Sequence, residues 1–282
     1  MRDKPIEQSV SELLENGEDL VVATIVSQIG STPRTAGTTM VIRRDGSILG
    51  TIGGGLVEAQ TMEAARDVFA GGQSQTLDFD LSHNEVSRDM DLICGGKTSV
   101  QLDMIRPEPE TIRNWRSRAE ARAAIRPVLY LFGAGHVARQ TAVLAGMLDF
   151  RVAVLDDRSA FANRDRFPEA EEVRVLDSFD QAFQGLSIDA GSFLLILTRG
   201  HSHDRTVLAQ ALRSEAGYIG MIGSRRKRDT IYDSLLQEGF SRKDLDRVFC
   251  PVGLEINAET PAEIGVSIVA QLIQQRAALQ RR

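Results

Sequence analysis

Residues 128–138 read VLYLFGAGHVA and indicate the fold class of the second half of the chain. An apolar run leads into a G-x-G-x-x-A pattern, which predicts a buried strand, a tight turn and the start of a helix. Gly133 permits the turn, Gly135 lets the backbone approach a phosphate, and the small Ala138 lets the helix pack closely on the strand. The free N–H groups and positive dipole end of that helix favour an anion. The stretch therefore predicts the first strand–helix unit of a Rossmann-type domain.

An acidic residue lies where such a domain would place it. Asp156 ends the next predicted strand, about 20 residues further on, where a carboxylate can accept hydrogen bonds from a ribose. His136 lies inside the loop and could donate to a phosphate, and an exposed loop histidine is the alternative. The glycines could also serve only a tight strand–helix turn. The ligand class stays open, since a dinucleotide, a single nucleotide or another phosphorylated cofactor could occupy the same loop.

From residue 127 onward, short apolar stretches alternate with helical patterns. Such alternation is typical of a parallel, doubly wound sheet with helices on both faces. The predicted strands cover 128–132, 151–156, 173–176, 193–198, 218–222 and 248–251, and the predicted helices cover 138–148, 205–212, 227–238 and 262–279. The fold class is therefore α/β, with a Rossmann-like domain over residues 127–282.

The loop TRGHSHD at 198–204 follows the fourth strand, at the edge where open α/β sheets bind ligands. Arg199 and His201 are predicted to make polar contacts to a ligand there. A metal site built on His201 and His203 lacks a visible third ligand, so ligand contacts are favoured. Asp204 is a candidate N-cap of the following helix.

The loop after the fifth strand, GSRRKR at 223–228, is basic. Ser224 and Arg225 are predicted to contact a phosphate, because a hydroxyl and a guanidinium both donate to phosphate oxygens. Capping of the next helix by Ser224 and a solvated basic helix face are the alternatives.

Residues 1–106 have a different pattern. Predicted strands at 20–29, 38–43, 47–52, 76–81 and 98–105 and predicted helices at 6–14 and 56–69 indicate a smaller α+β domain with an antiparallel sheet. Asp45-Gly46 has the composition of a tight hairpin turn. Residues 107–126 are rich in Arg, Glu and Ala and lie between prolines, which indicates a partly helical linker.

Two glycine-rich corners stand out in this first domain. GSTPR at 30–34 contains Arg34, which could pair with a negatively charged group. TIGGGLVE at 51–58 contains the start of the second predicted helix. The consecutive glycines Gly53, Gly54 and Gly55 expose backbone N–H groups and suit an oxygen-rich ligand. Glu58 lies in the first turn of that helix.

The two cysteines differ in their surroundings. Cys94 lies in a CGGK corner at 94–97, where the ammonium of Lys97 would favour a thiolate, which is a soft metal ligand and a nucleophile. Cys250 lies in an apolar strand and is interpreted as an inert core residue. An inert role for Cys94 is the alternative, and a functional one is favoured.

The composition excludes some classes of protein. The chain has 282 residues and a formal net charge of -6, which argues against broad binding to nucleic acid or to acidic membranes. Two cysteines do not make a disulfide framework, the N-terminus has no signal-peptide pattern, and the apolar runs are too short to span a bilayer. A cytoplasmic protein is expected, and a homodimer is the default expectation for its assembly.

Taken together and in order, these motifs resemble the XdhC/CoxI family over nearly the whole chain. The resemblance rests on 30–34 with Gly37 and Met40, 45–46, 50–55 with Glu58, the cysteine motif 94–96, the loop 132–138, and the later motifs 198–201, 220–224, 251–254 and 262–264.

The resemblance implies an accessory protein that binds the molybdenum cofactor in its molybdopterin form. Such proteins promote exchange of an oxo for a sulfido ligand together with a cysteine desulfurase, and deliver the product to an apo molybdenum hydroxylase of the xanthine dehydrogenase type. By this resemblance Cys94 would lie near the metal or its sulfur. Arg34 and the corner from Gly53 to Glu58 would help form the pocket, and Gly133 to Ala138 would take a phosphate.

Two other functions stay open. An NAD(P)-dependent oxidoreductase would need an acid–base residue such as His201 or His203 beside the nicotinamide. An interaction scaffold would leave the glycine corners unexplained. A nucleotide on the Rossmann-like domain is compatible with either the accessory protein or the oxidoreductase.

Overall fold

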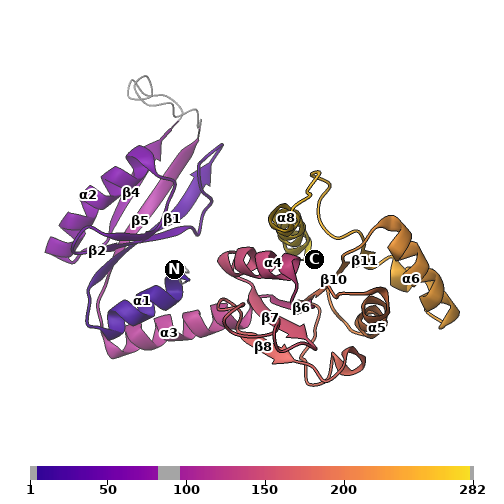
Figure 1. Cartoon of the computed structure of the whole chain (residues 1–282). Coiled ribbons are helices and arrows are strands. Elements are labelled where there is room, and N and C mark those ends of the chain that lie inside the picture. Colours follow the sequence, from indigo (N-terminus) through magenta and orange to yellow (C-terminus); the bar gives the residue numbers. More distant parts are fainter. Residues whose placement is uncertain (1–4, 82–95, 280–282) are drawn as a thin grey trace. The chain divides into compact units, whose positions relative to one another are not determined.

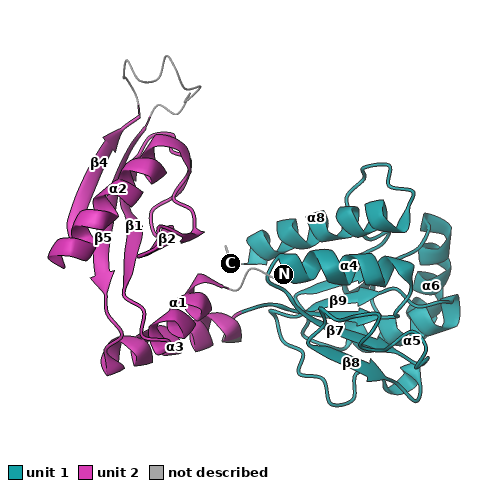
Figure 2. Cartoon of the chain, turned by 60° about the vertical axis from the view of Figure 1, so that its left-hand side comes forward, with its two compact units in different colours: residues 1–2, 126–282 teal, residues 3–125 magenta. Residues whose placement is uncertain are grey.

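The computed structural model describes residues 5–81 and 96–279 of the chain (Figure 1). The described residues divide into two compact units, one up to Ile125 and the other from Arg126 (Figure 2). The first unit contains an antiparallel sheet and the second a parallel one. This arrangement confirms the predicted fold class.

The first unit contains a five-stranded sheet in the order β3-β2-β1-β5-β4. All neighbouring strands in it are antiparallel. The strands are β1 (Leu20–Ile29), β2 (Thr39–Arg43), β3 (Ile48–Gly50), β4 (Gln75–Asp80) and β5 (Lys97–Ile105). Each follows from a stretch of β-branched or alternating residues in the sequence.

Helices cover both faces of this sheet, because its central strands are apolar on both sides. On β1, Val21 and Ala23 belong to the cluster beneath helix α2 (Gly55–Gly71), whereas Leu20 and Val22 pack with the opposite helices. Those opposite helices are α1 (Ile6–Glu15) and α3 (Pro109–Ala124) (Figure 1). The interval 107–126 expected to be a linker is therefore mostly helix α3, whose Trp115 is buried against α1.

The second unit contains a six-stranded sheet in the order β8-β7-β6-β9-β10-β11. All its pairings are parallel. The strands are β6 (Val128–Phe132), β7 (Arg151–Asp156), β8 (Glu172–Val175), β9 (Phe193–Ile196), β10 (Tyr218–Met221) and β11 (Val248–Phe249). The chain runs outward from β6 to β8 and then restarts at β9 on the other side. The topological switch point, where such sheets bind ligands, lies between β6 and β9.

Helices again cover both faces. Leu129 and Leu131 pack beneath α4 (His136–Met147) and α8 (Pro261–Leu279), and Tyr130 and Phe132 belong to the cluster that includes α5 and α6. The remaining helices are α5 (His201–Leu212), α6 (Arg225–Gln237), the short α7 (Arg242–Leu245) and the 3-10 turn η2 (Phe179–Gln181). Helices α4 and α8 approach closely, since a Cβ on Gly265 would lie 3.0 Å from Cβ of Gln140.

Candidate functional site

The glycine-rich loop follows β6, between the ends of β7 and β9. Gly133 has a φ of +110°, and a Cβ at this position would lie 2.3 Å from the carbonyl oxygen of Leu197. Its own N–H donates to the carbonyl of Leu155 at 2.7 Å. Any side chain at residue 133 would collide with the backbone that follows β9, so the loop requires glycine here.

Gly135 precedes the first residue of α4 and has open space beside it, since a Cβ there would meet nothing within 4 Å. Among the described residues, no side chain caps this helix. Ala138 is fully buried against the sheet. The first-turn N–H groups of α4 can therefore face a ligand, and an anionic group fits beside Gly135.

Asp156 ends β7 and is 1% exposed. Its Oδ2 accepts the N–H of Ala134 at 2.8 Å and a guanidinium N–H of Arg158 at 2.9 Å. Its Oδ1 accepts the backbone N–H and the Nε–H of Arg158 at 3.0 and 2.8 Å. These hydrogen bonds raise the pKa of Arg158. Both oxygens already have donors, so a ribose could bind this carboxylate only by displacing some of them.

The next residue, Asp157, pairs with Arg199 through two hydrogen bonds. One of them joins Nη2 to Oδ2 at 2.7 Å. The Arg199 guanidinium holds the pKa of Asp157 below its usual range, and the carboxylate in turn raises the pKa of Arg199. Asp157 follows β7 and Arg199 follows β9, the two neighbours of β6. The ion pair therefore joins the two loops that flank the glycine-rich loop.

Two further side chains complete the surroundings of the loop. Arg166 donates to the carbonyl of Ala134 at 3.4 Å. The ring of Phe161 lies 3.8 Å from the Arg158 guanidinium and 4.9 Å from that of Arg166. Sequence reasoning misses Arg166 and Phe161, because they lie in an irregular stretch without periodicity or motif. Their proximity to residue 134 comes from the path of the chain between β7 and β8.

Two of the predicted histidines lie at the surface. His136 and His201 are exposed in the first turns of α4 and α5. The ring of His203 lies 4.9 Å from that of Phe179. Within residues 5–81 and 96–279, no cluster of three or more His, Cys, Asp or Glu side chains could hold a metal ion.

Asp204 is not the N-cap of α5, which corrects the prediction. The N-cap is Gly200, so the helix begins four residues earlier than predicted and Asp204 lies in its first turn. The Asp204 carboxylate is fully buried, accepts the Thr198 hydroxyl at 2.7 Å and forms an ion pair with Lys227. The ammonium of Lys227 also donates to the carbonyl of Ile222 at 3.1 Å. This buried ion pair joins the first turns of α5 and α6, the helices that follow β9 and β10.

The basic loop after β10 lies further along the sheet edge, because β9 separates β10 from β6. Ser224 caps α6 by accepting the N–H of Lys227 at 3.2 Å. The side chain of Arg225 is 77% exposed and lies 3.9 Å from Glu255. The structure brings Asp156 and Arg199 to the glycine-rich loop and leaves Ser224 and Arg225 outside that group.

The glycine corners of the first unit meet one another. A Cβ on Gly53, whose φ is +128°, would lie 2.9 Å from Pro33 and 3.8 Å from Cγ of Arg34. A Cβ on Gly96 would lie 2.6 Å from the carbonyl oxygens of Ile29 and Ser31. Cys94 itself lies outside the described residues. Gly96 is packed against 29–32, so the stretch 29–34 contacts both Gly53 and Gly96.

Glu58 holds the triple-glycine corner in place. Its Oε2 accepts the Thr51 hydroxyl at 2.7 Å and the N–H of Gly54 at 3.0 Å. Gly54 and Gly55 have φ values of +76° and +59°, and a Cβ on either would meet nothing within 4 Å. The open side of this corner and the exposed Arg34 could receive an oxygen-rich group.

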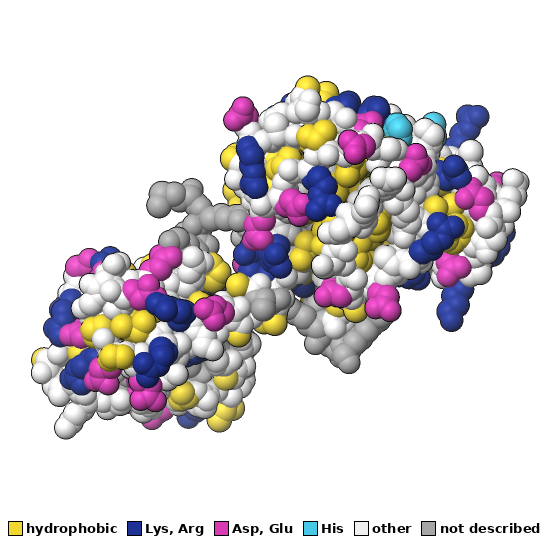
Figure 3. All heavy atoms as spheres, turned by 90° about the horizontal axis from the view of Figure 1, so that it is seen from below, with side chains coloured by type: hydrophobic (Ala, Val, Ile, Leu, Met, Phe, Trp, Pro, Cys, Tyr) yellow, Lys and Arg dark blue, Asp and Glu magenta, His cyan; other side chains and the backbone are white. Residues whose placement is uncertain are grey.

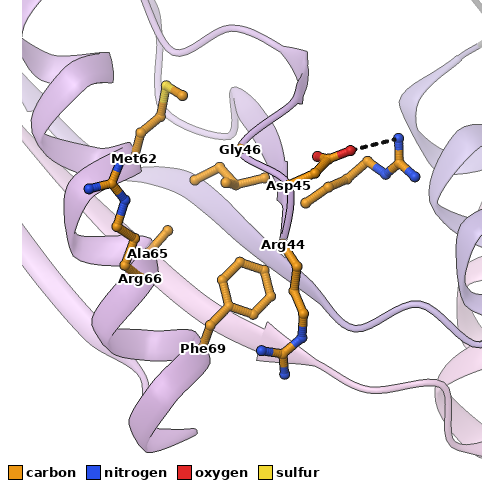
Figure 4. A pocket seen from close by; sticks show the side chains of 9 residues that line it. Arg44, Asp45, Gly46, Met62, Ala65, Arg66 and Phe69 are labelled. Atoms are coloured by element: carbon orange, nitrogen blue, oxygen red, sulfur yellow. Dashed lines mark ion pairs between the residues drawn. The ribbon is translucent and has the colours of Figure 1, made fainter.

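A separate hollow of about 190 Å³ lies between the β2–β3 turn and α2 (Figure 4). Its walls include Met62, Arg66 and Phe69 of α2, and the Arg44 guanidinium lies 4.9 Å from the Phe69 ring. None of the predicted site residues lines this hollow.

Cys250 is 8% exposed, and burial raises the pKa of its thiol to about 11. This agrees with its interpretation as an inert core residue. On the face in Figure 3, acidic and basic side chains are interspersed over both units. None of the described helices has the length and apolar character that a bilayer crossing requires.

Two family models match the chain. The XdhC Rossmann domain matches residues 129–272, and the XdhC and CoxI family matches residues 13–80. A crystal structure of a xanthine dehydrogenase from Bacillus halodurans superposes with a TM-score of 0.82 at 25% identity and covers 96% of both chains.

Three curated relatives each align with 94% of this chain. The uncharacterised protein YqeB of Escherichia coli is 32% identical, and the chain spans only 45% of its length. A Bacillus subtilis protein named as a probable component of xanthine dehydrogenase is 26% identical, with 95% of its length covered. The molybdenum cofactor insertion chaperone PaoD of Escherichia coli is 25% identical, with 86% of its length covered.

Proposed function

Since this chain belongs to the XdhC and CoxI family, we propose that it binds the molybdenum cofactor and supports its sulfuration and its insertion into an apo molybdenum hydroxylase of the xanthine dehydrogenase type. The cofactor is cargo in this role, taken up and handed on. The observation that carries the proposal is the near-complete alignment with a relative named as a molybdenum cofactor insertion chaperone.

The geometry of the second unit is suited to the phosphate of a pterin cofactor. Gly135 leaves space beside the uncapped end of α4, and Arg166 and Arg199 bring positive charge to the neighbouring loops. A phosphate there would receive backbone N–H groups and guanidinium donors together. His136 and His201, exposed in the first turns of α4 and α5, are further candidate donors.

The surroundings of Asp156 favour this role over an NAD(P)-dependent oxidoreductase. In a dinucleotide site the corresponding carboxylate accepts the hydroxyls of the ribose. Here Arg158 and the N–H of Ala134 already satisfy both of its oxygens. This edge of the sheet therefore fits a phosphorylated ligand whose binding does not require a carboxylate for ribose hydroxyls better than it fits NAD.

For the reactive end of the cargo we assign Cys94 as the ligand of the metal or the carrier of its sulfur. The role of Cys94 rests on the family resemblance, and the contacts of the 30–34 loop with Gly53 and with Gly96 support an oxygen-rich binding corner in the same unit. A cysteine desulfurase would be the partner that supplies sulfur, and the apo hydroxylase the partner that receives the product. We further propose a cytoplasmic homodimer.

The test is mass spectrometry of the small molecule that co-purifies with the full chain from molybdenum-replete cells, together with activation of an apo xanthine dehydrogenase. We expect molybdopterin in the wild type. Cys94→Ala should fold, but should either lose the cofactor or deliver an inactive, unsulfurated form. Normal client activation by that variant would contradict the role of Cys94, and NAD(H) or NADP(H) in place of a pterin would favour the oxidoreductase.

A further inference from the structure

The ion pair between Asp157 and Arg199 joins the two loops that flank the glycine-rich loop. We infer that Asp157 is an internal counter-anion, which holds Arg199 while no ligand is bound and yields it to the phosphate of an incoming phosphorylated ligand. The inference rests on the proposed function only in that the ligand is anionic at this loop. It names Asp157 as the residue that sets the affinity of the site.

Two adjacent aspartates provide an internal comparison. Asp156 is 1% exposed and holds Arg158 through three hydrogen bonds, in addition to its bond from the N–H of Ala134. Asp157 is 18% exposed and holds Arg199, whose side chain is 41% exposed. Two hydrogen bonds join this second pair, and both come from the guanidinium. Both guanidinium groups reach solvent, since Arg158 is 31% exposed, so the pairs differ in the carboxylate: Asp156 is buried within the loop, whereas Asp157 is accessible.

The position of the second pair makes an exchange of partners possible. It joins the loops after β7 and β9, and the glycine-rich loop after β6 lies between them. An anion beside Gly135 would be attracted by Arg199 and by the positive end of α4, and repelled by the carboxylate of Asp157. Transfer of the guanidinium from carboxylate to phosphate keeps two parallel N–H···O bonds, because both acceptors match the guanidinium fork.

Arg166 adds positive charge beside the same loop. Its guanidinium donates to the carbonyl of Ala134, and its Nε is buried and lacks a hydrogen-bond partner among the described residues. Within that part of the chain, Arg166 also forms no ion pair with a carboxylate, unlike Arg158 and Arg199. The positive charge beside the loop is therefore only partly balanced by the protein.

The inference is tested by titrating the full chain with inorganic phosphate in a calorimeter at constant ionic strength. Asp157→Asn removes the competing carboxylate and should tighten phosphate binding roughly tenfold, the scale of one charge-assisted hydrogen bond. Arg199→Gln should weaken binding by a similar factor. In the variant that combines both changes, Asp157→Asn should hardly improve phosphate affinity. The Arg199 guanidinium that it would free is absent, so only the small effect of removing a nearby negative charge remains.

Glu172→Gln is the matched control, since it neutralises one carboxylate of an exposed arginine pair at the start of β8, the opposite end of the strands. It should leave phosphate affinity unchanged, and an equal gain from it would overturn the inference. Weaker phosphate binding by folded Asp157→Asn would also overturn it, because Asp157 would then position Arg199 instead of competing for it. Molybdopterin titrated in parallel separates the two proposals: if the wild type binds phosphate but no molybdopterin, the proposed function fails while the exchange can still be measured.

Discussion

Gly133 and Gly135 lie two residues apart in the same loop, yet the structure gives them different constraints. Gly133 has a positive φ and contacts the backbone after β9, whereas Gly135 has a φ of -73° and open space beside it. The first residue is required by the fold. The backbone at the second would accept any residue, and we propose that the missing side chain leaves room for the ligand.

This difference predicts opposite effects of two alanine substitutions. Gly133→Ala should lower the free energy of unfolding by about 3 kcal/mol, because it combines backbone strain with overpacking. Gly135→Ala should keep nearly wild-type stability but weaken phosphate binding, since its methyl group enters the ligand's space. Denaturant unfolding and phosphate titration of both variants measure this. A stable Gly133→Ala variant, or full binding by Gly135→Ala, would contradict our assignment.

Cys250 should be almost unreactive in the folded protein. Burial raises the pKa of its thiol to about 11, so the reactive thiolate is scarce below that pH and increases only as the pH approaches it. Iodoacetamide at pH 7.5, followed by peptide mass spectrometry, should leave residue 250 unmodified until denaturant is added. If native Cys250 were labelled as fast as Cys250 in the denatured chain, the thiol would not be buried as described.

Among the elements, the sequence predicts the strands of both sheets better than the helix ends. The β-branched residues of β1, the alternation on β4 and the apolar runs of β6 and β9 are local signals, so the predicted strands lie close to their true bounds. Helix α5 begins at His201, with Gly200 as an N-cap that has no side chain. Its first turn is polar, so the hydrophobic periodicity that predicts the helix begins only later. The sequence predicts only a partly helical linker at 107–126, because charged residues dominate it and its apolar side becomes evident only in contact with α1 and the sheet.

The buried side of helix α3 should contribute to the stability of the first unit. Trp115 is 6% exposed and packs with Val10 and Leu14 of α1, so Trp115→Ala should destabilise the first unit by about 3 kcal/mol or more. Ile125→Ala is the control, because Ile125 lies at the end of the same helix and is 72% exposed. This variant should change the free energy of unfolding little. Denaturant unfolding monitored by circular dichroism would test this. Equal stability of the two variants would mean that α3 is not part of the core.

At the scale of the whole molecule, the apolar clusters of the described residues each belong to one unit. Two lie in the antiparallel unit and two on the faces of the parallel sheet. Each unit thus brings its own glycine-rich site: the corners around Gly53 and Gly96 in one, and the loop at Gly133 in the other.

The candidate site could be predicted from sequence only in part. The G-x-G-x-x-A motif, Asp156 and Arg199 follow from strand ends, because parallel strands bring their carboxyl ends to one edge. The partners of those residues could not be predicted in this way. The pairing of Asp156 with Arg158, of Asp157 with Arg199 and the approach of Arg166 to Ala134 depend on the paths of irregular loops, which have no period to read.

The most direct test of the central claim is a comparison of ligands on one preparation of the full chain. Dissociation constants for molybdopterin, NADH and NADPH would be measured by titration at the same ionic strength. We predict that molybdopterin binds the wild type, and that Gly135→Ala weakens this binding. Neither dinucleotide should bind measurably, because Asp156 already accepts hydrogen bonds from Arg158. Tight NADH or NADPH binding without affinity for the pterin would contradict the claim.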